Sequence, residues 1–394
     1  MGGNGMNEWK KVKLKKCCTK IGSGSTPKGG VTVYIEDGVS LIRSQNVYNL
    51  HFDYNGLTHI DADAAYKLRG VKVFENDILM NITGDSVART CIVPSKVLPA
   101  RVNQHVAIIR VDKNVINPFF LSYYLASPRM QAFMLSLAVG KGASRNALTK
   151  GMIENFEVPC PILCTQNRIV TILSRYDSLI KNYQKQIKLL EEAAQRLYKE
   201  WFVDLRFPGY ENTPIVDGVP EGWKRKKLGE LSEFKRGKTI TKKGTIDGTF
   251  PVVAGGLTPA YYCNKYNTSN RVITISGSGA NAGYTRMYYE KVWASDCSYV
   301  DTDSAQYLHF TYCFLLNNKK TIDNMQKGAA QPHVYAKDIN GLDVIIPNKL
   351  LLDKFESSIK IQFDSIENTK NQIKYLTEAR NRLLPKLMSG EIEV

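Results

Sequence analysis

Two long stretches of the chain carry apolar side chains at alternating steps of four and three residues. The first holds Ile, Leu, Tyr, Ile, Tyr, Ile, Leu, Ala, Leu and Trp at positions 169, 173, 176, 180, 183, 187, 190, 194, 197 and 201. The same steps from position 355 give Phe, Ile, Gln, Ile, Thr, Ile, Leu, Arg, Leu and Leu, of which seven are apolar. Such spacing forms one apolar seam on an α-helix. The sequence therefore predicts long helices over 163–205 and 349–388.

The two stretches are copies within an internal repeat that has an offset of 186 residues. The recurring residues are Leu190, Glu192, Ala193, Arg196 and Leu197, which return as Leu376, Glu378, Ala379, Arg382 and Leu383. Two seams in one register favour pairing of the helices with each other over packing of each helix on its own domain. A seam of about 33 residues at 1.5 Å per residue spans roughly 50 Å, which is longer than one small domain.

The segments before the helices repeat more weakly. Trp9 and Leu14 correspond to Trp223 and Leu228, and Ile153, Val158 and Pro161 correspond to Ile339, Val344 and Pro347. Both segments hold short β-rich runs, such as 105–111 and 271–275, and a short apolar helix, at 118–126 and 306–316. Mixed α/β domains with irregular sheets are expected.

The predicted order is a flexible N-terminal segment (1–7), a first domain (8–162), a helix (163–205), a linker (206–221), a second domain (222–348), a helix (349–388) and a C-terminal tail (389–394). The linker is indicated by Pro208, Gly209, Pro214, Gly218 and Pro220. The fold class is α+β, with two pseudo-symmetric α/β domains separated by two long antiparallel coiled-coil helices. Antiparallel helices would put the two domains at opposite ends, related by a pseudo-twofold axis.

Charge points to a polyanionic partner. The net charge is +16, and the excess occurs in both halves: 20 Lys and Arg against 12 Asp and Glu in residues 8–162, and 17 against 10 in residues 222–348. Clustered Lys and Arg release counterions from phosphates, so nucleic acid is the expected partner.

The eight cysteines contain no CxxC pair, and the five histidines have no ligand spacing beside them, so neither a zinc site nor a disulfide framework is expected. No run of about 20 apolar residues and no signal peptide are present, which predicts a cytoplasmic protein with no membrane association.

Catalytic motifs are incomplete. Asn117-Pro118-Phe119-Phe120 lacks the second proline of the amino-methyltransferase loop and has no glycine fingerprint with it. Gly237-Lys238-Thr239 resembles the end of a phosphate-binding loop, but Ser232 stands where that motif needs glycine. No G-x-S-x-G elbow is recognisable. We expect no catalytic residues and no metal ligands.

The order of several short segments resembles the specificity subunit of Type I restriction-modification enzymes over nearly the whole chain. In the first domain these segments are Leu41 to Val47, Asp77 to Met80 leading to Gly84, Val102 to Val106, and Val158 to Pro161. In the second they are Pro251 to Gly256, Gly277 to Gly279, and Trp293 to Asp296, followed by Leu387 to Ile392 after the last helix.

The resemblance implies that each domain is a target recognition domain that reads half of a split DNA site. It also implies that the helices set the spacing and bind two methyltransferase subunits, with motor-nuclease subunits joining for restriction. No cofactor is expected in this chain, whereas S-adenosylmethionine, ATP and Mg²⁺ are expected in the partner subunits. Because the two domains differ in sequence, the site should be asymmetric. Readers about 50 Å apart exceed one turn of B-DNA, roughly 34 Å, so unread base pairs should separate the half-sites.

Base readout needs Arg, Lys, Asn or Gln on rigid loops. The first-domain candidates for DNA binding are Arg43, Gln45, Asn46, Arg89, Asn103, Gln104, Lys141, Arg145 and Asn146. The second-domain candidates are Arg236, Lys238, Lys242, Lys243, Asn281, Arg286, Lys327, Gln331 and His333. For any one of them, a solvated surface role or loop stabilisation remains the alternative.

Tyr198, Trp201 and Phe202 exceed what a two-helix seam must bury. We expect them to pack on the second domain or on a methyltransferase subunit, the alternative being internal packing only. Other classes also stay open for the whole chain: an RNA-binding or regulatory protein, a stand-alone DNA methyltransferase or nuclease, and a structural coiled-coil scaffold.

Overall fold

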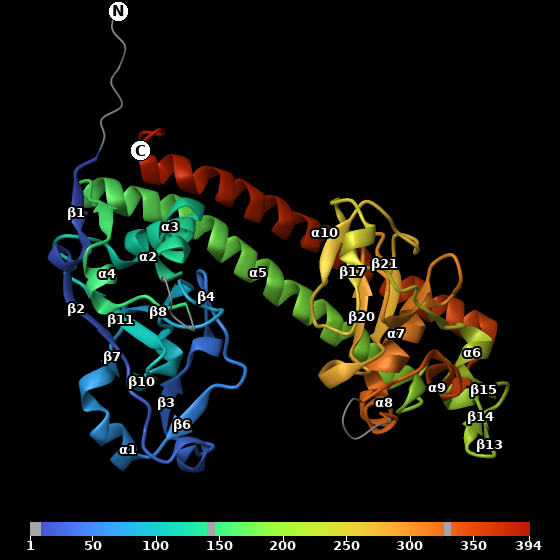
Figure 1. Cartoon of the computed structure of the whole chain (residues 1–394). Helices are drawn as coiled ribbons and strands as arrows, with labels where there is room; N and C mark the ends of the chain where they lie inside the picture. Colours follow the sequence, from blue (N-terminus) through green and yellow to red (C-terminus); the bar gives the residue numbers. More distant parts are fainter. Residues whose placement is uncertain (1–8, 140–145, 327–331) are drawn as a thin grey trace, which may run out of the picture. The chain divides into compact units, whose positions relative to one another are not determined.

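The computed structural model describes residues 9–139, 146–326 and 332–394 (Figure 1). The predicted segment 1–7 lies outside these residues. The chain divides into two compact units, Met1–Ile180 with Lys374–Val394, and Lys181–Ile373. Each unit therefore contains part of both long helices, α5 (Leu163–Phe202) and α10 (Lys349–Ser389).

Both long helices occur where the apolar seams predict them, with small differences at their ends. Helix α5 ends at Phe202, where the prediction extended to 205, because Leu205 has a positive φ of 57° and the Arg206 N–H donates to the Glu200 carbonyl over 2.8 Å. The predicted linker contains a hairpin of β13 (Ile215–Val216) and β14 (Val219–Pro220), joined by Asp217 and Gly218, both with positive φ.

Unit 1 is built on two four-stranded sheets, in the orders β6-β3-β10-β7 and β2-β11-β8-β9. A further pair, β1 with β12, joins the start of the first domain to its end. The strands are β1 (Lys11–Lys13), β2 (Cys18–Ser23), β3 (Val39–Ile42), β4 (Val47–Tyr48), β5 (His51–Phe52), β6 (Thr58–Ile60), β7 (Lys72–Val73), β8 (Ile78–Asn81), β9 (Thr90–Ile92), β10 (Ala100–Val102), β11 (Val106–Val111) and β12 (Glu157–Pro159). The short helices are α1 (Ala62–Lys67), α2 (Pro118–Ala126), α3 (Pro128–Ala138) and α4 (Lys150–Glu154).

Unit 2 repeats this plan. Its four-stranded sheet has the order β16-β22-β19-β20, which matches β2-β11-β8-β9, and its three-stranded sheet β18-β17-β21 matches β6-β3-β10. The strands are β15 (Lys224–Lys227), β16 (Lys235–Arg236), β17 (Phe250–Val253), β18 (Tyr261–Cys263), β19 (Val272–Ser276), β20 (Thr285–Tyr288), β21 (Trp293–Ala294), β22 (Cys297–Asp301) and β23 (Asp343–Ile346). The short helices are α6 (Leu228–Leu231), α7 (Leu308–Asn317), α8 (Lys319–Asn324) and α9 (Ala336–Asn340).

The long helices are part of the domain cores. In unit 1, Ile169 and Leu173 of α5 share a core with Leu384 and Leu387 of α10. In unit 2, the later part of α5 shares a core with the first part of α10. The beginning of one helix thus packs with the end of the other in each unit, which is the antiparallel pairing that the seams predict.

The polar residue Arg380 interrupts the apolar seam of α10, and the structure supplies its partner. Its Nη1 atom forms an ion pair with Asp177 of α5, and the hydroxyl of Tyr123 on α2 donates to the same carboxylate. Burial, followed by this hydrogen bond, raises the pKa of Tyr123. Two helices and the first domain are therefore joined through one carboxylate.

We expect Asp177→Asn to lower the free energy of unfolding of unit 1 by about 1–2 kcal/mol, because the amide loses the charge that Arg380 needs in a partly buried site. The loss should appear as faster amide exchange in α2 and in the last turns of α10. Glu192→Gln is the control, since that carboxylate is exposed and pairs with Lys188 at 3.8 Å on the surface. Equal exchange in both variants would contradict the assignment.

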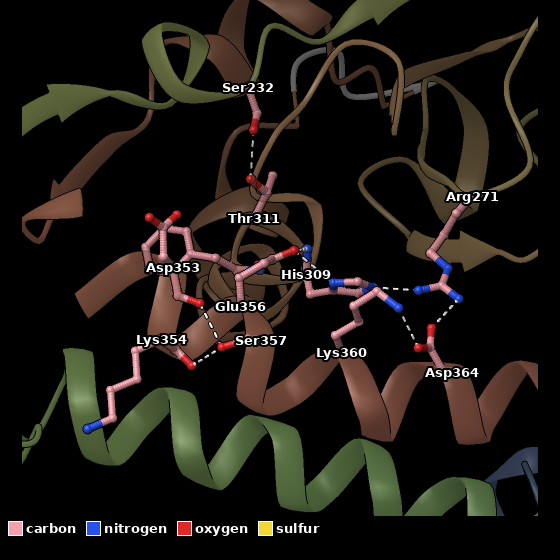
Figure 2. A network of polar contacts seen from close by, with 11 residues as sticks. Ser232, Arg271, His309, Thr311, Asp353, Lys354, Glu356, Ser357, Lys360 and Asp364 are labelled. Atoms are coloured by element: carbon pink, nitrogen blue, oxygen red, sulfur yellow. Dashed lines mark hydrogen bonds and ion pairs between the residues drawn. The ribbon is translucent and has the colours of Figure 1, made fainter. Parts of the chain in front are cut away.

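A larger polar network joins the second domain to α10 (Figure 2). Glu356 accepts from the backbone N–H groups of His309 and Phe310, both over 3.1 Å, and so caps α7. Its Oε1 also lies 2.7 Å from Nδ1 of His309. Arg271, which precedes β19, donates from Nη1 to Nε2 of His309 over 2.9 Å. A guanidinium only donates, so His309 carries its proton on Nδ1.

Arg271 also forms ion pairs with α10. Its Nη2 lies 2.9 Å from Asp364 and contacts Glu367 as well. The guanidinium end is largely buried, with 13% of the side chain exposed. Hydrogen bonds and ion pairs thus fix the positions of the sheet, helix α7 and helix α10 relative to one another within unit 2.

Tyr198, Trp201 and Phe202 at the end of α5 are buried in an aromatic cluster of unit 2, with 4%, 8% and 8% of their surfaces exposed. The ring of Phe202 lies 4.7 Å from that of Phe355 and 5.0 Å from that of Phe310. These contacts agree with packing on the second domain. They leave little of the three side chains exposed for contact with a partner subunit.

No helix in the three described ranges is long and apolar enough to cross a membrane.

Candidate nucleic-acid interface

A loop at the end of β8 gathers several polar side chains of the first domain. After Asn81, the chain turns through Gly84, which has a positive φ of 76°. The Gly84 N–H donates to the Asn146 carbonyl over 3.0 Å, and Thr83 forms a β-bridge with Ala147. The Thr83 hydroxyl lies 2.7 Å from Nδ1 of His105, which directly precedes β11. Residues from three distant parts of the sequence therefore meet here.

The second domain has the same arrangement at the end of β19. Gly279 has a positive φ of 77°, and its N–H donates to the Pro332 carbonyl over 3.0 Å. Ser278 forms a β-bridge with His333. The Ser278 hydroxyl donates to Oδ2 of Asp296, which directly precedes β22. We call residues 83–89 and 278–284 the first and second sheet-end loops.

Arg43 and Gln45 are brought together beside a different loop of the first domain. The Nη2 atom of Arg43 and the Nε2 atom of Gln45 donate to the carbonyl oxygen of Gly56, over 2.8 and 3.0 Å. Gly56 has a positive φ of 65°, and an added Cβ would lie 2.4 Å from Nε2 of Gln45. This position favours glycine, because a side chain would displace Gln45.

Asn46 and Asn103 are used inside the protein. Asn46 is 0% exposed, and its amide donates to the Asp53 carbonyl over 2.9 Å. Asn103 is 8% exposed, and its Oδ1 accepts from the His105 N–H over 3.1 Å. Both side chains shape the loops that carry other candidates, so we do not include them among the proposed base contacts.

The other first-domain candidates lie around the first sheet-end loop. Gln104 and Asn146 are exposed next to it. Arg89 closes the loop, and its guanidinium lies 4.6 Å from the centre of the Tyr48 ring. Lys141 and Arg145 lie outside the described residues.

The basic candidates of the second domain follow strand β16. Arg236 lies on that strand, Lys238 follows it, and Lys242 and Lys243 begin a short turn beyond; all four side chains are exposed. Exposed cations suit contacts with phosphates, which position a protein on DNA.

The remaining candidates of the second domain lie near the second sheet-end loop. Asn281 lies in the loop, half-buried, and Arg286 lies on β20, where its Nη1 donates to the Leu257 carbonyl over 3.0 Å. His333 stacks on Tyr335, with ring centres 5.8 Å apart and planes 9° apart. Lys327 and Gln331 lie outside the described residues.

Sequence reasoning missed Thr83 and Ser278 in the two sheet-end loops, and it missed their side-chain partners His105 and Asp296. The residue types expected for base readout are Arg, Lys, Asn and Gln, with His333 as one exception among the sequence candidates. The signal was present, since Gly84 and Gly279 each follow a hydroxyl residue at the end of an apolar run. Recognising it needed the strand pairing, because His105 and Asp296 are distant from those glycines in sequence.

Thiol chemistry is suppressed in the sheets beneath these loops. Burial raises the pKa of Cys91 and of Cys297 to about 12. Both thiols are therefore protonated at neutral pH. Among the described residues, no three His, Cys, Asp or Glu side chains are grouped so that they could hold a metal ion.

Comparisons with known proteins show which family this chain resembles. A family model described as the Type I restriction modification DNA specificity domain matches residues 6–192 and 220–375. The chain is 26% identical to the Type I restriction enzyme MjaIX specificity subunit of Methanocaldococcus jannaschii, with 97% of this chain and 93% of that protein covered. It is 29% identical to the EcoBI specificity subunit of Escherichia coli, over 39% of this chain and 31% of that protein.

A solved structure of the S subunit of a Type I restriction-modification system from M. genitalium is similar in fold. Its TM-score is 0.57 at 17% identity, with 98% of this chain and 97% of that chain covered. Together with the repeated match of the family model, this likeness confirms the predicted fold class.

Proposed function

The chain belongs to the family of Type I restriction-modification DNA specificity subunits, and we propose that it reads a bipartite, asymmetric site in duplex DNA. It is a specificity subunit and not a catalytic one. The single observation that carries the proposal is the pair of sheet-end loops, one in each unit, with the same backbone contacts and different side chains. Two equal scaffolds with different side chains suit the recognition of two different short sequences.

The charge of the chain supports a phosphate-bearing partner. The net charge is +16. Exposed cations lie on strand β16 or in the segment that follows it, among them Arg236, Lys238, Lys242 and Lys243. Phosphate contacts of this kind fix the register of a protein on DNA, while groups on rigid loops distinguish the bases. Gln104, Asn146 and Arg89 in the first domain, and Asn281 and His333 in the second, are the sequence candidates that meet this second requirement.

We propose further that the two long helices bind methyltransferase subunits, and that motor-nuclease subunits join that complex. Support comes from apolar side chains that the helices leave exposed: 50% of Leu189, 74% of Ile361 and 62% of Tyr375. Apolar surface that the helices leave exposed would be removed from water on binding a partner, which favours association. S-adenosylmethionine, ATP and Mg²⁺ would then be bound by the partners, and this chain would carry no cofactor.

Competition binding tests the proposal. The chain, assembled with its methyltransferase subunits, should bind labelled duplex DNA, and unlabelled duplex should compete better than single-stranded DNA or RNA of the same sequence. The logarithm of affinity should fall linearly with the logarithm of salt concentration, with a slope of about −0.9 per phosphate contact. Stronger competition by RNA or by single strands would instead support an RNA-binding or regulatory protein.

A further inference from the structure

The two sheet-end loops are equivalent residue by residue. The Val87 N–H donates to the Gly84 carbonyl over 3.1 Å, and the Ala282 N–H donates to the Gly279 carbonyl over 3.0 Å. Next along each loop, the Ala88 N–H donates to the Asn81 carbonyl over 2.8 Å, and the Gly283 N–H donates to the Ser276 carbonyl over 2.9 Å. Ala88 and Gly283 both have positive φ, 71° and 83°. Thr83 therefore corresponds to Ser278.

The partner of each hydroxyl also occupies an equivalent position. The Ile82 N–H donates to the His105 carbonyl over 2.9 Å, and the Gly277 N–H donates to the Asp296 carbonyl over 3.2 Å. His105 and Asp296 each precede the strand that pairs with the strand carrying the loop, β11 with β8 and β22 with β19. Each unit thus holds a hydroxyl in contact with a polar side chain, and only the chemistry of that side chain differs.

This difference changes what each unit can recognise. A carboxylate only accepts hydrogen bonds, whereas an imidazole can donate or accept. In the major groove, cytosine N4 and adenine N6 are the amino groups that a carboxylate can bind. Because Ser278 donates to Oδ2 of Asp296, Oδ1 is available to accept from such a group.

Asp296 is exposed in a domain in which Lys and Arg outnumber Asp and Glu by 17 to 10 over residues 222–348. An exposed carboxylate on a surface that approaches phosphates is repelled by them, and hydrogen bonds that it accepts from the bases would offset this cost. The hydrogen bond from Ser278 restrains the orientation of Asp296, and base readout favours such a restraint because a fixed acceptor reaches an amino group at one position only.

We propose that Asp296 is a specificity-determining residue of the second domain and that it accepts a hydrogen bond from the amino group of a cytosine or adenine. His105 has the equivalent role in the first domain, with Thr83 and Ser278 as the positioning residues. This inference rests on the proposed function and goes beyond it by naming the residue that distinguishes the two half-sites.

The test compares D296N with wild type in the complete methyltransferase complex, using single-molecule sequencing of methylated DNA. The asparagine keeps an oxygen that can accept from Ser278, but it adds an amide donor. The D296N complex should methylate the original motif at least about tenfold more slowly than wild type. Its base preference should change at one cytosine or adenine of one half-site only. H105N should change the other half-site only.

Two further variants separate readout from loop structure. S278A keeps the carboxylate but removes its restraint, so it should weaken discrimination at the same base without changing which base is preferred. D343N is the matched control, because Asp343 is an exposed carboxylate of the same domain that pairs with Lys227 at 2.6 Å. It should leave the motif and the rate unchanged.

The outcomes distinguish this inference from the proposed function. If wild type produces no motif, the proposed function fails and the inference fails with it. If wild type produces a bipartite motif and D296N methylates that motif at the same rate, Asp296 does not determine specificity. A D296N complex that alters both half-sites together, or that unfolds at a lower temperature than D343N, would assign Asp296 a structural role instead.

Discussion

Replacing Phe355 by alanine should lower the free energy of unfolding of unit 2 by about 3–5 kcal/mol, the range typical of a buried phenylalanine. Phe355 lies on α10 with none of its surface exposed. Its ring contacts those of Tyr198, Trp201 and Phe202 from α5, at 6.1, 5.6 and 4.7 Å between ring centres. The cavity would open where both long helices meet the second domain, so no single element could move to fill it.

The measurement is denaturant unfolding followed by tryptophan fluorescence, since Trp201 lies in the cluster. Leu350→Ala is the control on the same helix, because 81% of Leu350 is exposed and its loss should cost less than about 0.5 kcal/mol. The loss in the free energy of unfolding for Phe355→Leu should lie between those of Phe355→Ala and Leu350→Ala. A Phe355→Ala variant as stable as the Leu350→Ala control would show that the cluster does not stabilise unit 2.

Glu356→Ala should cost about 2–4 kcal/mol, for a different reason. Its carboxylate accepts from the backbone N–H groups of His309 and Phe310 and from Nδ1 of His309. Only 17% of Glu356 and 7% of His309 side-chain surface is exposed, so water cannot readily replace the lost acceptor. Three donors would be left buried without partners, and helix α7 would lose its cap.

Hydrogen exchange should locate this loss, with the amides of α7 exchanging faster than those of β19 and β22. Glu356→Gln should be intermediate, because the amide keeps one acceptor oxygen but turns a donor toward the other donors. Glu378→Ala, an exposed position on the same helix, should change little. Uniform exchange across unit 2 in the Glu356→Ala variant would contradict a local capping role.

The long helices could be predicted because their apolar seams repeat over many turns in one register. The polar interruptions of the second seam could not be interpreted from sequence. Arg380 is a polar residue at an apolar position of the seam, and in the structure it pairs with Asp177 on α5. Sequence spacing shows which face of a helix is apolar, but it does not show which distant carboxylate faces a cation.

The candidate site was predictable only in part. Side-chain chemistry indicates Gln104, Asn146, Asn281 and His333, and the structure places them at or beside the sheet-end loops. The buried amide of Asn46 shows the limit of that choice, since side-chain type does not report burial. The equivalence of His105 and Asp296 depends on strand register, because these residues are unlike each other and each contacts a loop distant in sequence.

The most direct test of the central claim is single-molecule sequencing of adenine methylation in genomic DNA. Cells that express this chain with its methyltransferase subunit would be compared with cells that lack the chain. We expect a new asymmetric motif made of two short specified blocks with an unread spacer between them. No new motif, with the complex shown to be assembled and supplied with methyl donor, would contradict the assignment of DNA-sequence recognition to this chain.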